Sequence, residues 1–119
     1  MVRSSTAIII PAFNEEKNIG SVIQNAKIFG DVIVIDDCSL DMTREVAHNL
    51  GAKVISHDLN RGYDQALNTG FIFAASLNYK FIITIDADGQ HDPKMLKHFQ
   101  DALKNGAECV VGFLYFQNL

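Results

Sequence analysis

Short apolar runs alternate with longer amphipathic stretches along this chain. The apolar runs are rich in isoleucine and valine, and they predict buried β-strands at residues 6–10, 31–35, 52–56, 80–85 and 108–111. The amphipathic stretches carry apolar residues at helical spacing and predict helices at 14–29, 40–50, 63–77 and 93–105. Strands and helices therefore alternate from one end of the chain to the other.

Capping residues support these boundaries. Asn14, Ser39 and Asp92 are predicted helix N-caps, and Pro93 suits the first position of the last helix. Strands that are apolar on both faces and separated by helices favour a parallel sheet covered on both sides. The predicted fold is a Rossmann-like three-layer α/β/α sandwich with a mainly parallel sheet, formed by a single domain over residues 1–119.

Polar clusters follow three of the predicted strands, at residues 11–15, 36–41 and 86–90. In open α/β sheets, ligands bind beyond the carboxyl ends of the strands. The three clusters are therefore expected on one edge of the sheet, where they would form a ligand site.

The cluster after the fourth strand reads Asp86-Ala87-Asp88-Gly89-Gln90. Its two carboxylates repel each other unless a cation or hydrogen-bond donors lie between them. Hard divalent cations prefer oxygen ligands, which both aspartates and the Gln90 amide can supply. The alternative is a polar turn that ends the strand and caps the next helix.

The other two clusters each leave two interpretations open. In the pair Asp36-Asp37, one acid can accept hydrogen bonds from a nucleobase or ribose, or Asp37 and Ser39 can cap the next helix. In the segment 11–15, Phe13 can offer an apolar wall to a ligand, and Glu15 can accept hydrogen bonds from sugar or base hydroxyls. The alternative is that this segment is an ordinary helix start.

Single residues near these clusters are weaker candidates. Arg61 could meet a phosphate or remain solvated, and His91 could contact an acceptor or a phosphate. The other histidines, His48, His57 and His98, are predicted to be surface or helix residues.

Composition narrows the function classes. A net charge of −4 argues against a nucleic-acid partner held by the overall field. Cys38 and Cys109 form no zinc motif and are typical of reduced cysteines in an intracellular protein. Apolar runs are too short to span a bilayer. The expected localisation is cytoplasmic, or peripheral at the inner face of the membrane.

Four stretches in register resemble the family-2 glycosyltransferases of the GT-A fold: IIIPAFNEEKNIGSVI, VIVIDDCSLDMT, NRGYDQALNTGF and TIDADGQHDPKML. They extend over almost the whole chain. The sequence DADGQHDP is typical of dolichyl-phosphate mannose or glucose synthases and related polyprenyl-phosphate glycosyltransferases.

The resemblance implies a role for each matching residue. The nucleotide pocket would be lined by Pro11, Phe13, Glu15, Ile35 and Asp37. The diphosphate would be surrounded by Asp86, Ala87, Asp88 and Gln90. Asp88 and Gln90 would bind Mg²⁺ or Mn²⁺, with Asp86 in support, and Asp86 and Asp88 would be the catalytic carboxylates.

The resemblance also implies the substrates. The donor would be a nucleoside-diphosphate sugar of the GDP-mannose or UDP-glucose type. The acceptor would be a polyprenyl or dolichyl phosphate at a membrane surface, which is already an anion and needs no dedicated general base.

The chain departs from the family pattern in three respects. Asp64 stands where the family usually has glycine, and Gly112 is followed by apolar residues instead of Ser-Arg. Family domains are also longer, so the chain is expected to contain the donor-binding half of a GT-A fold without the acceptor half. The apolar tail at 113–116 is expected either to pair with a second copy, giving a homo-oligomer, or to pack on the core.

The sequence also bears on three other function classes. A module that holds a nucleotide sugar without turnover would carry the same donor motifs and stays an alternative. A signalling receiver domain is disfavoured because the acidic pair follows the second strand and no lysine follows Lys104. A dinucleotide-dependent oxidoreductase is disfavoured because no G-x-G-x-x-G follows the first strand.

Overall fold

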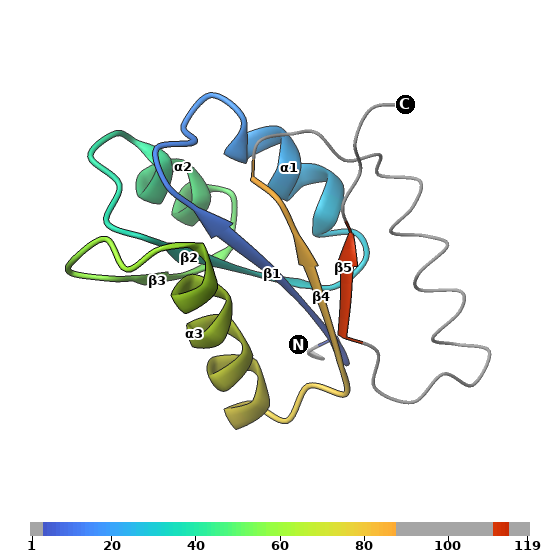
Figure 1. The fold of residues 1–119 in the computed structure, drawn as a ribbon. Helices are drawn as coiled ribbons and strands as arrows, with labels where there is room; N and C mark the ends of the chain where they lie inside the picture. Colours follow the sequence, from blue (N-terminus) through green and yellow to red (C-terminus); the bar gives the residue numbers. More distant parts are fainter. Residues whose placement is uncertain (1–3, 88–110, 115–119) are drawn as a thin grey trace.

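The computed structural model describes residues 4–87 and 111–114, with the backbone alone for the second range. These residues form a sheet with the strand order β3-β2-β1-β4-β5, in which every neighbouring pair is parallel (Figure 1). The strands are β1 (Thr6–Ala12), β2 (Asp31–Asp36), β3 (Lys53–Ser56), β4 (Phe81–Ile85) and β5 (Val111–Leu114). The described helices are α1 (Ile19–Ala26), α2 (Thr43–Asn49) and α3 (Tyr63–Ser76).

The helices cover both faces of the sheet, with α1 and α2 on one side and α3 on the other (Figure 1). Alternate residues of β1 explain this arrangement, because successive side chains of a strand point to opposite faces. Ile8 and Ile10 pack in the cluster that contains α1 and α2, whereas Ala7 and Ile9 pack in the cluster that contains α3. A strand that is apolar on both faces therefore holds two separate cores together.

Helix α3 approaches the sheet closely at Gly70. A Cβ added at Gly70 would overlap Cγ2 of Ile9 and lie 3.4 Å from Cγ1 of Ile35. The absence of a side chain at this position lets the middle of α3 pack closely against β1 and β2.

Strand β1 is longer than the sequence predicts, because it passes through Pro11 to Ala12. Its pairing with β4 stops at Ile9, whereas its pairing with β2 continues to the partners Ala12 and Asp36. Pro11 lies where only one neighbour continues the ladder, a position at which a missing amide is tolerated.

Two helices begin later than predicted. The N-cap of α1 is Asn18 and that of α2 is Met42, and neither makes a side-chain cap hydrogen bond. Asn14 and Cys38 adopt left-handed backbone conformations, with φ of 53° and 67°, so the chain turns there before each helix starts. The predicted N-caps Asn14 and Ser39 are therefore wrong.

The fifth strand is also displaced, from the predicted 108–111 to Val111–Leu114. It pairs with β4 from the partners Ile82 and Val111 to Ile85 and Leu114. Residues 113 and 114 of the apolar tail thus pair with β4 of the chain's own sheet. The predicted helix at 93–105, residues 108–110 and residues 115–116 lie outside the described residues.

Candidate functional site

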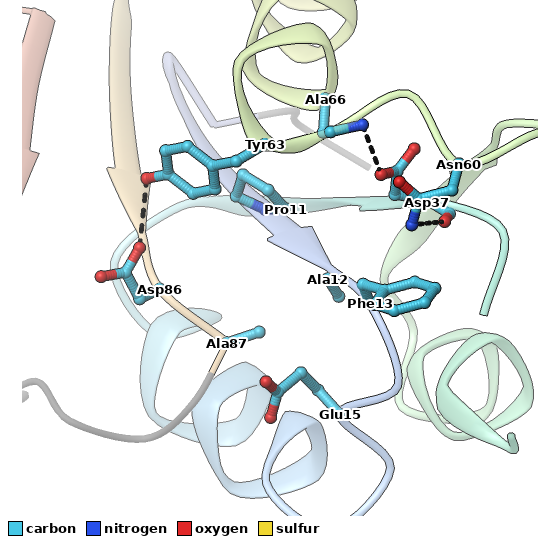
Figure 2. Close-up of a pocket in the computed structure, with 11 residues that line it drawn as sticks. Pro11, Ala12, Phe13, Glu15, Asp37, Asn60, Tyr63, Ala66, Asp86 and Ala87 are labelled. Carbon is cyan, nitrogen blue, oxygen red and sulfur yellow. Dashed lines mark hydrogen bonds between the residues drawn. The ribbon is translucent and has the colours of Figure 1, made fainter.

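A pocket of about 660 Å³ opens beyond the carboxyl ends of β1, β2 and β4 (Figure 2). The chain runs outward from β1 to β3 and then crosses back to β4, so the pocket lies where the strand order reverses. The described residues that line it are Pro11, Ala12, Phe13, Glu15, Asp37, Asn60, Gly62, Tyr63, Ala66, Asp86 and Ala87.

The segment after β1 forms one wall. Phe13 is 46% exposed and presents its ring at the pocket edge, while the Glu15 carboxylate points toward Ala87 across the opening (Figure 2). Both residues were predicted to lie at a ligand site. The structure brings them together with the ends of β2 and β4.

Hydrogen bonds join this segment to the loop after β2. The amide of Asn14 donates to Oγ of Ser39 at 2.9 Å, and the amide of Leu40 donates to Oδ1 of Asn14 at 2.8 Å. The amide of Glu15 donates to Oγ1 of Thr43 at 2.8 Å. Asn14 and Ser39 therefore hold two loops in a fixed relation instead of capping helices.

The two adjacent acids at the end of β2 have different roles. Asp36 is fully buried, and its Oδ2 lies 3.3 Å from Nε of Arg44 and accepts a hydrogen bond from the amide of Ser39. It stabilises the turn into α2 and does not line the pocket. Asp37 lines the pocket on the side of α3.

The Asp37 carboxylate accepts several hydrogen bonds from the loop after β3. Its Oδ1 accepts hydrogen bonds from the amide of Arg61 and from Nδ1 of His57, both at 2.8 Å. Its Oδ2 accepts a hydrogen bond from the amide of Gly62 at 2.9 Å, and the side-chain amide of Asn60 donates to the Asp37 carbonyl at 3.4 Å. The strand end and this loop thus form one wall of the pocket.

These contacts determine the charge of Asp37. Burial by itself raises the pKa of the carboxyl, but the hydrogen bonds from Arg61, His57 and Gly62, together with the charge of His57, hold the pKa below the ordinary aspartate value. Asp37 is therefore ionised, although its side chain is only 6% exposed.

His57 was predicted to be a surface or helix residue, and this was wrong. Its side chain is 8% exposed, and its Nε2 lies 2.8 Å from Oγ1 of Thr69 on α3. Its position directly after β3 was the available signal, because a residue there lies at the same sheet edge as Asp37.

At the end of β4, the hydroxyl of Tyr63 donates to Oδ1 of Asp86 at 3.1 Å (Figure 2). Tyr63 begins α3, after Gly62, whose φ of 92° suits glycine. Ala87 is 4% exposed and lines the pocket floor. The structure therefore links the second and fourth strand ends through α3.

The remaining predicted site residues do not reach the pocket or are not described. Ile35 is fully buried in the core beneath α3 and is not among the lining residues. The side chain of Arg61 pairs with Asp58 at 3.1 Å instead of lining the pocket. Asp88, Gln90 and His91 lie outside the described residues.

Of the three predicted metal ligands, Asp86 lies within the described residues. Within residues 4–87, no three histidine, cysteine or acidic side chains are grouped as a metal site. Asp86 does place a carboxylate at the pocket, and oxygen donors of this kind suit Mg²⁺ or Mn²⁺. No helix among the described residues has the length and apolar character needed to cross a membrane.

Comparison with known proteins decides the family. The model of glycosyl transferase family 2 matches residues 7–119. The chain belongs to this family. The membership predicted from the four sequence stretches is confirmed.

Solved structures agree on the fold. Glucosyl-3-phosphoglycerate synthase from Mycobacterium tuberculosis, in complex with UDP, is 28% identical with a TM-score of 0.70, and the match covers 87% of this chain and 41% of that one. The same enzyme with Mn²⁺ and UDP-glucose gives a TM-score of 0.70 at 28% identity, covering 87% and 40% of the two chains. The predicted GT-A-type α/β fold is confirmed.

Curated relatives include two sugar transferases whose names include dolichyl or dolichol phosphate. The UDP-N-acetylglucosamine–dolichyl-phosphate N-acetylglucosaminyltransferase of Methanococcus voltae is 34% identical over 88% of this chain and 50% of its own length. The dolichol-phosphate mannosyltransferase of Pyrococcus furiosus is 32% identical over 92% of this chain and 33% of its own length. The chain thus spans half or less of the length of these relatives.

Proposed function

We propose that this chain forms the donor-binding part of a glycosyltransferase that moves a sugar from a nucleoside-diphosphate sugar to a polyprenyl phosphate. The observation that carries the proposal is the pocket at the strand-order reversal, where residues from three strand ends meet. They include the acids Glu15, Asp37 and Asp86.

The pocket suits a nucleotide sugar in size and lining. Its volume of about 660 Å³ lies within the usual range for small-molecule sites. The ring of Phe13 offers a flat apolar surface for a base, and Glu15 offers a carboxylate to sugar or base hydroxyls. Asp37 supports the wall formed by Asn60 and Gly62.

A divalent cation fits the β4 side of this proposal. Asp88 and Gln90 would bind Mg²⁺ or Mn²⁺, with Asp86 in support, and the cation when bound would offset the charge of the departing diphosphate. Asp86 is held at the pocket by Tyr63, which fixes the position of its carboxylate. The Mn²⁺ in the mycobacterial synthase supports a divalent ion at such a site.

The relatives and the chemistry of phosphates support the proposed acceptor. The names of the relatives from Methanococcus voltae and Pyrococcus furiosus include dolichyl or dolichol phosphate. A phosphate acceptor is already an anion at neutral pH, so it can attack the anomeric carbon without a general base in the pocket. The protein then acts at a membrane surface, on which its acceptor lies.

The test combines donor binding with transfer. UDP-glucose and GDP-mannose are titrated into the chain with and without Mn²⁺, and sugar transfer to a short-chain polyprenyl phosphate is measured. Asp88→Ala is expected to abolish metal-dependent binding while the thermal unfolding midpoint is unchanged. Equal affinity in the variant, with and without Mn²⁺, would overturn the site assignment.

The same assay separates the enzyme from a module that binds without turnover. Transfer that depends on Mn²⁺ supports the transferase. Binding that depends on Mn²⁺, with no transfer or hydrolysis, supports a nucleotide-sugar-binding module instead.

A further inference from the structure

His57 joins three separate parts of the pocket wall. It follows β3, its Nδ1 lies 2.8 Å from Asp37 at the end of β2, and its Nε2 lies 2.8 Å from Thr69 on α3. Its side chain is 8% exposed, so water contributes little to either contact. Each ring nitrogen must therefore be matched to its protein partner as donor or acceptor.

The Thr69 contact identifies Nε2 as a donor. The hydroxyl of Thr69 donates its single proton to the carbonyl oxygen of Gln65, one turn earlier in α3, at 3.0 Å. A hydroxyl whose proton is used in this way can only accept a further hydrogen bond. The proton in the contact between His57 and Thr69 is therefore on the ring.

The Asp37 contact identifies Nδ1 as a donor as well. Both carboxylate oxygens of Asp37 accept hydrogen bonds from backbone amides, those of Arg61 and Gly62. An ionised carboxylate has no proton to give, so the ring must donate here too.

We propose that His57 is a positioning residue of the donor pocket that acts as an imidazolium, with a proton on each ring nitrogen. Its charge holds the Asp37 carboxylate in the orientation in which that group fixes the amides of Arg61 and Gly62 at the pocket wall. The consequence for donor binding rests on the proposed function, whereas the protonation state does not.

The charged groups around His57 are consistent with this state. Asp37 is the acid in direct contact, at 2.8 Å. Asp58 and Arg61, which flank it in the same loop, are exposed and pair with each other at 3.1 Å. Asp64, in the first turn of α3, is also exposed. The Asp37 carboxylate is thus the near charge that an imidazolium would offset.

A neutral ring would give a different function to the same three side chains. With a proton on Nδ1 alone, His57 would accept from the Thr69 hydroxyl, as in a relay that activates a nucleophile. The hydrogen bond from Thr69 to Gln65 would then be lost, and Thr69 is not among the residues that line the pocket. The observed contacts favour the charged ring.

The first experiment measures the protonation state directly. Ring ¹⁵N–¹H correlation spectra of the full 119-residue chain are recorded across pH, with His57→Gln used to assign the signals. Two protonated ring nitrogens at neutral pH are expected. A neutral ring with a lone pair on Nε2 would overturn the proposal, whether or not the chain binds a nucleotide.

A second variant avoids dependence on a substitution that could unfold the loop. Thr69→Val removes the acceptor for Nε2 and leaves the Asp37 contact, whereas Thr69→Ser keeps the hydroxyl. In Thr69→Val, the Nε2 proton signal of His57 is expected to weaken or vanish at neutral pH, whereas Thr69→Ser is expected to keep it. Identical ring spectra in the two variants would contradict the donor role of Nε2.

The link to the pocket is tested with UDP and with GDP in the presence of Mn²⁺. His57→Gln is expected to lower the affinity for the nucleotide about tenfold, which is the effect of losing one charge-assisted hydrogen bond. His48→Gln, at an exposed position on α2, is the matched control and is expected to bind as the parent does.

The pH profile distinguishes charge from a merely structural role. Parent affinity is expected to be lower at alkaline pH than at neutral pH, and the affinity of His57→Gln is expected to be equal at both. Equal pH profiles would overturn the positioning role. If neither nucleotide binds the parent, the proposed function fails while the spectra still decide the state of His57.

Discussion

The β2 side and the β4 side of the pocket both carry acids, but the protein contacts of these acids differ. At the end of β2, three donors from the protein converge on the Asp37 carboxylate. At the end of β4, the Tyr63 hydroxyl contacts Asp86, and Asp88 follows two residues later. Hydrogen-bond donors of the protein offset the negative charge of Asp37. We propose that a cation shared with the sugar donor offsets the charge of the acids after β4. Acids at neighbouring strand ends can therefore serve structure on one side and ligand binding on the other.

The largest expected effect is on stability at the β2 side. Asp37→Ala removes the carboxylate that three donors share and leaves His57 without its charge partner. The free energy of unfolding is expected to fall by about 3 kcal/mol, as for other broken buried ion pairs. Urea denaturation measures this, and a loss of less than about 0.5 kcal/mol, typical of a surface site, would contradict the assignment.

The next effect is on ligand binding at the β4 side. Asp86→Asn keeps the size of the side chain and removes its charge, so Mn²⁺-dependent binding of UDP or GDP is expected to weaken about tenfold. The free energy of unfolding is expected to change by less than about 1 kcal/mol. A large loss of stability with unchanged nucleotide affinity would reverse the two roles.

The pH dependence of stability provides a third test. Because the pKa of Asp37 is lower in the folded chain than in the unfolded chain, its contribution is complete above the unfolded pKa of about 3.9 and is lost as pH falls through the folded value. Unfolding free energies are therefore expected to decline less steeply below about pH 5 in Asp37→Asn than in the parent. Parallel curves would show that this carboxyl is not coupled to folding.

The smallest effect is expected at Tyr63. Tyr63→Phe removes the hydroxyl that contacts Asp86 and keeps the ring at the pocket. A change of about 0.5–1 kcal/mol in unfolding free energy is expected, with a modest loss of metal-dependent affinity. Binding calorimetry of Tyr63→Phe, Asp86→Asn and the double variant tests whether the two residues are coupled. Coupled residues give non-additive effects in the double variant.

Much of the fold was predictable because it depends on local pattern. Apolar runs separated by helical stretches predicted β1 to β4, α3 and the parallel arrangement, and the strand ends predicted the edge that carries the pocket. Boundaries near loops were less accurate. The left-handed turns at Asn14 and Cys38 delay α1 and α2, and β5 begins where the predicted strand ends.

Side-chain roles across loops were the least predictable part of the site. Asn14 and Ser39 lie 25 residues apart in the chain, and His57 lies 20 residues from Asp37. A residue suited to capping a helix is equally suited to joining two loops, because the same oxygen accepts either amide. Ile35 lies two residues before Asp37 and packs beneath α3, so it belongs to the core and not to the pocket.

The amino-acid sequence alone determined the family, the parallel α/β architecture and the sheet edge at which a ligand would bind. These depend on the spacing of apolar residues and on motifs in chain order, which folding does not alter. Only the tertiary structure decided that Asp37 is held by His57, Arg61 and Gly62, because those contacts exist once β2, the loop after β3 and α3 pack together. Long-range hydrogen bonds of this kind follow from the relative placement of elements and leave no periodic trace in the sequence.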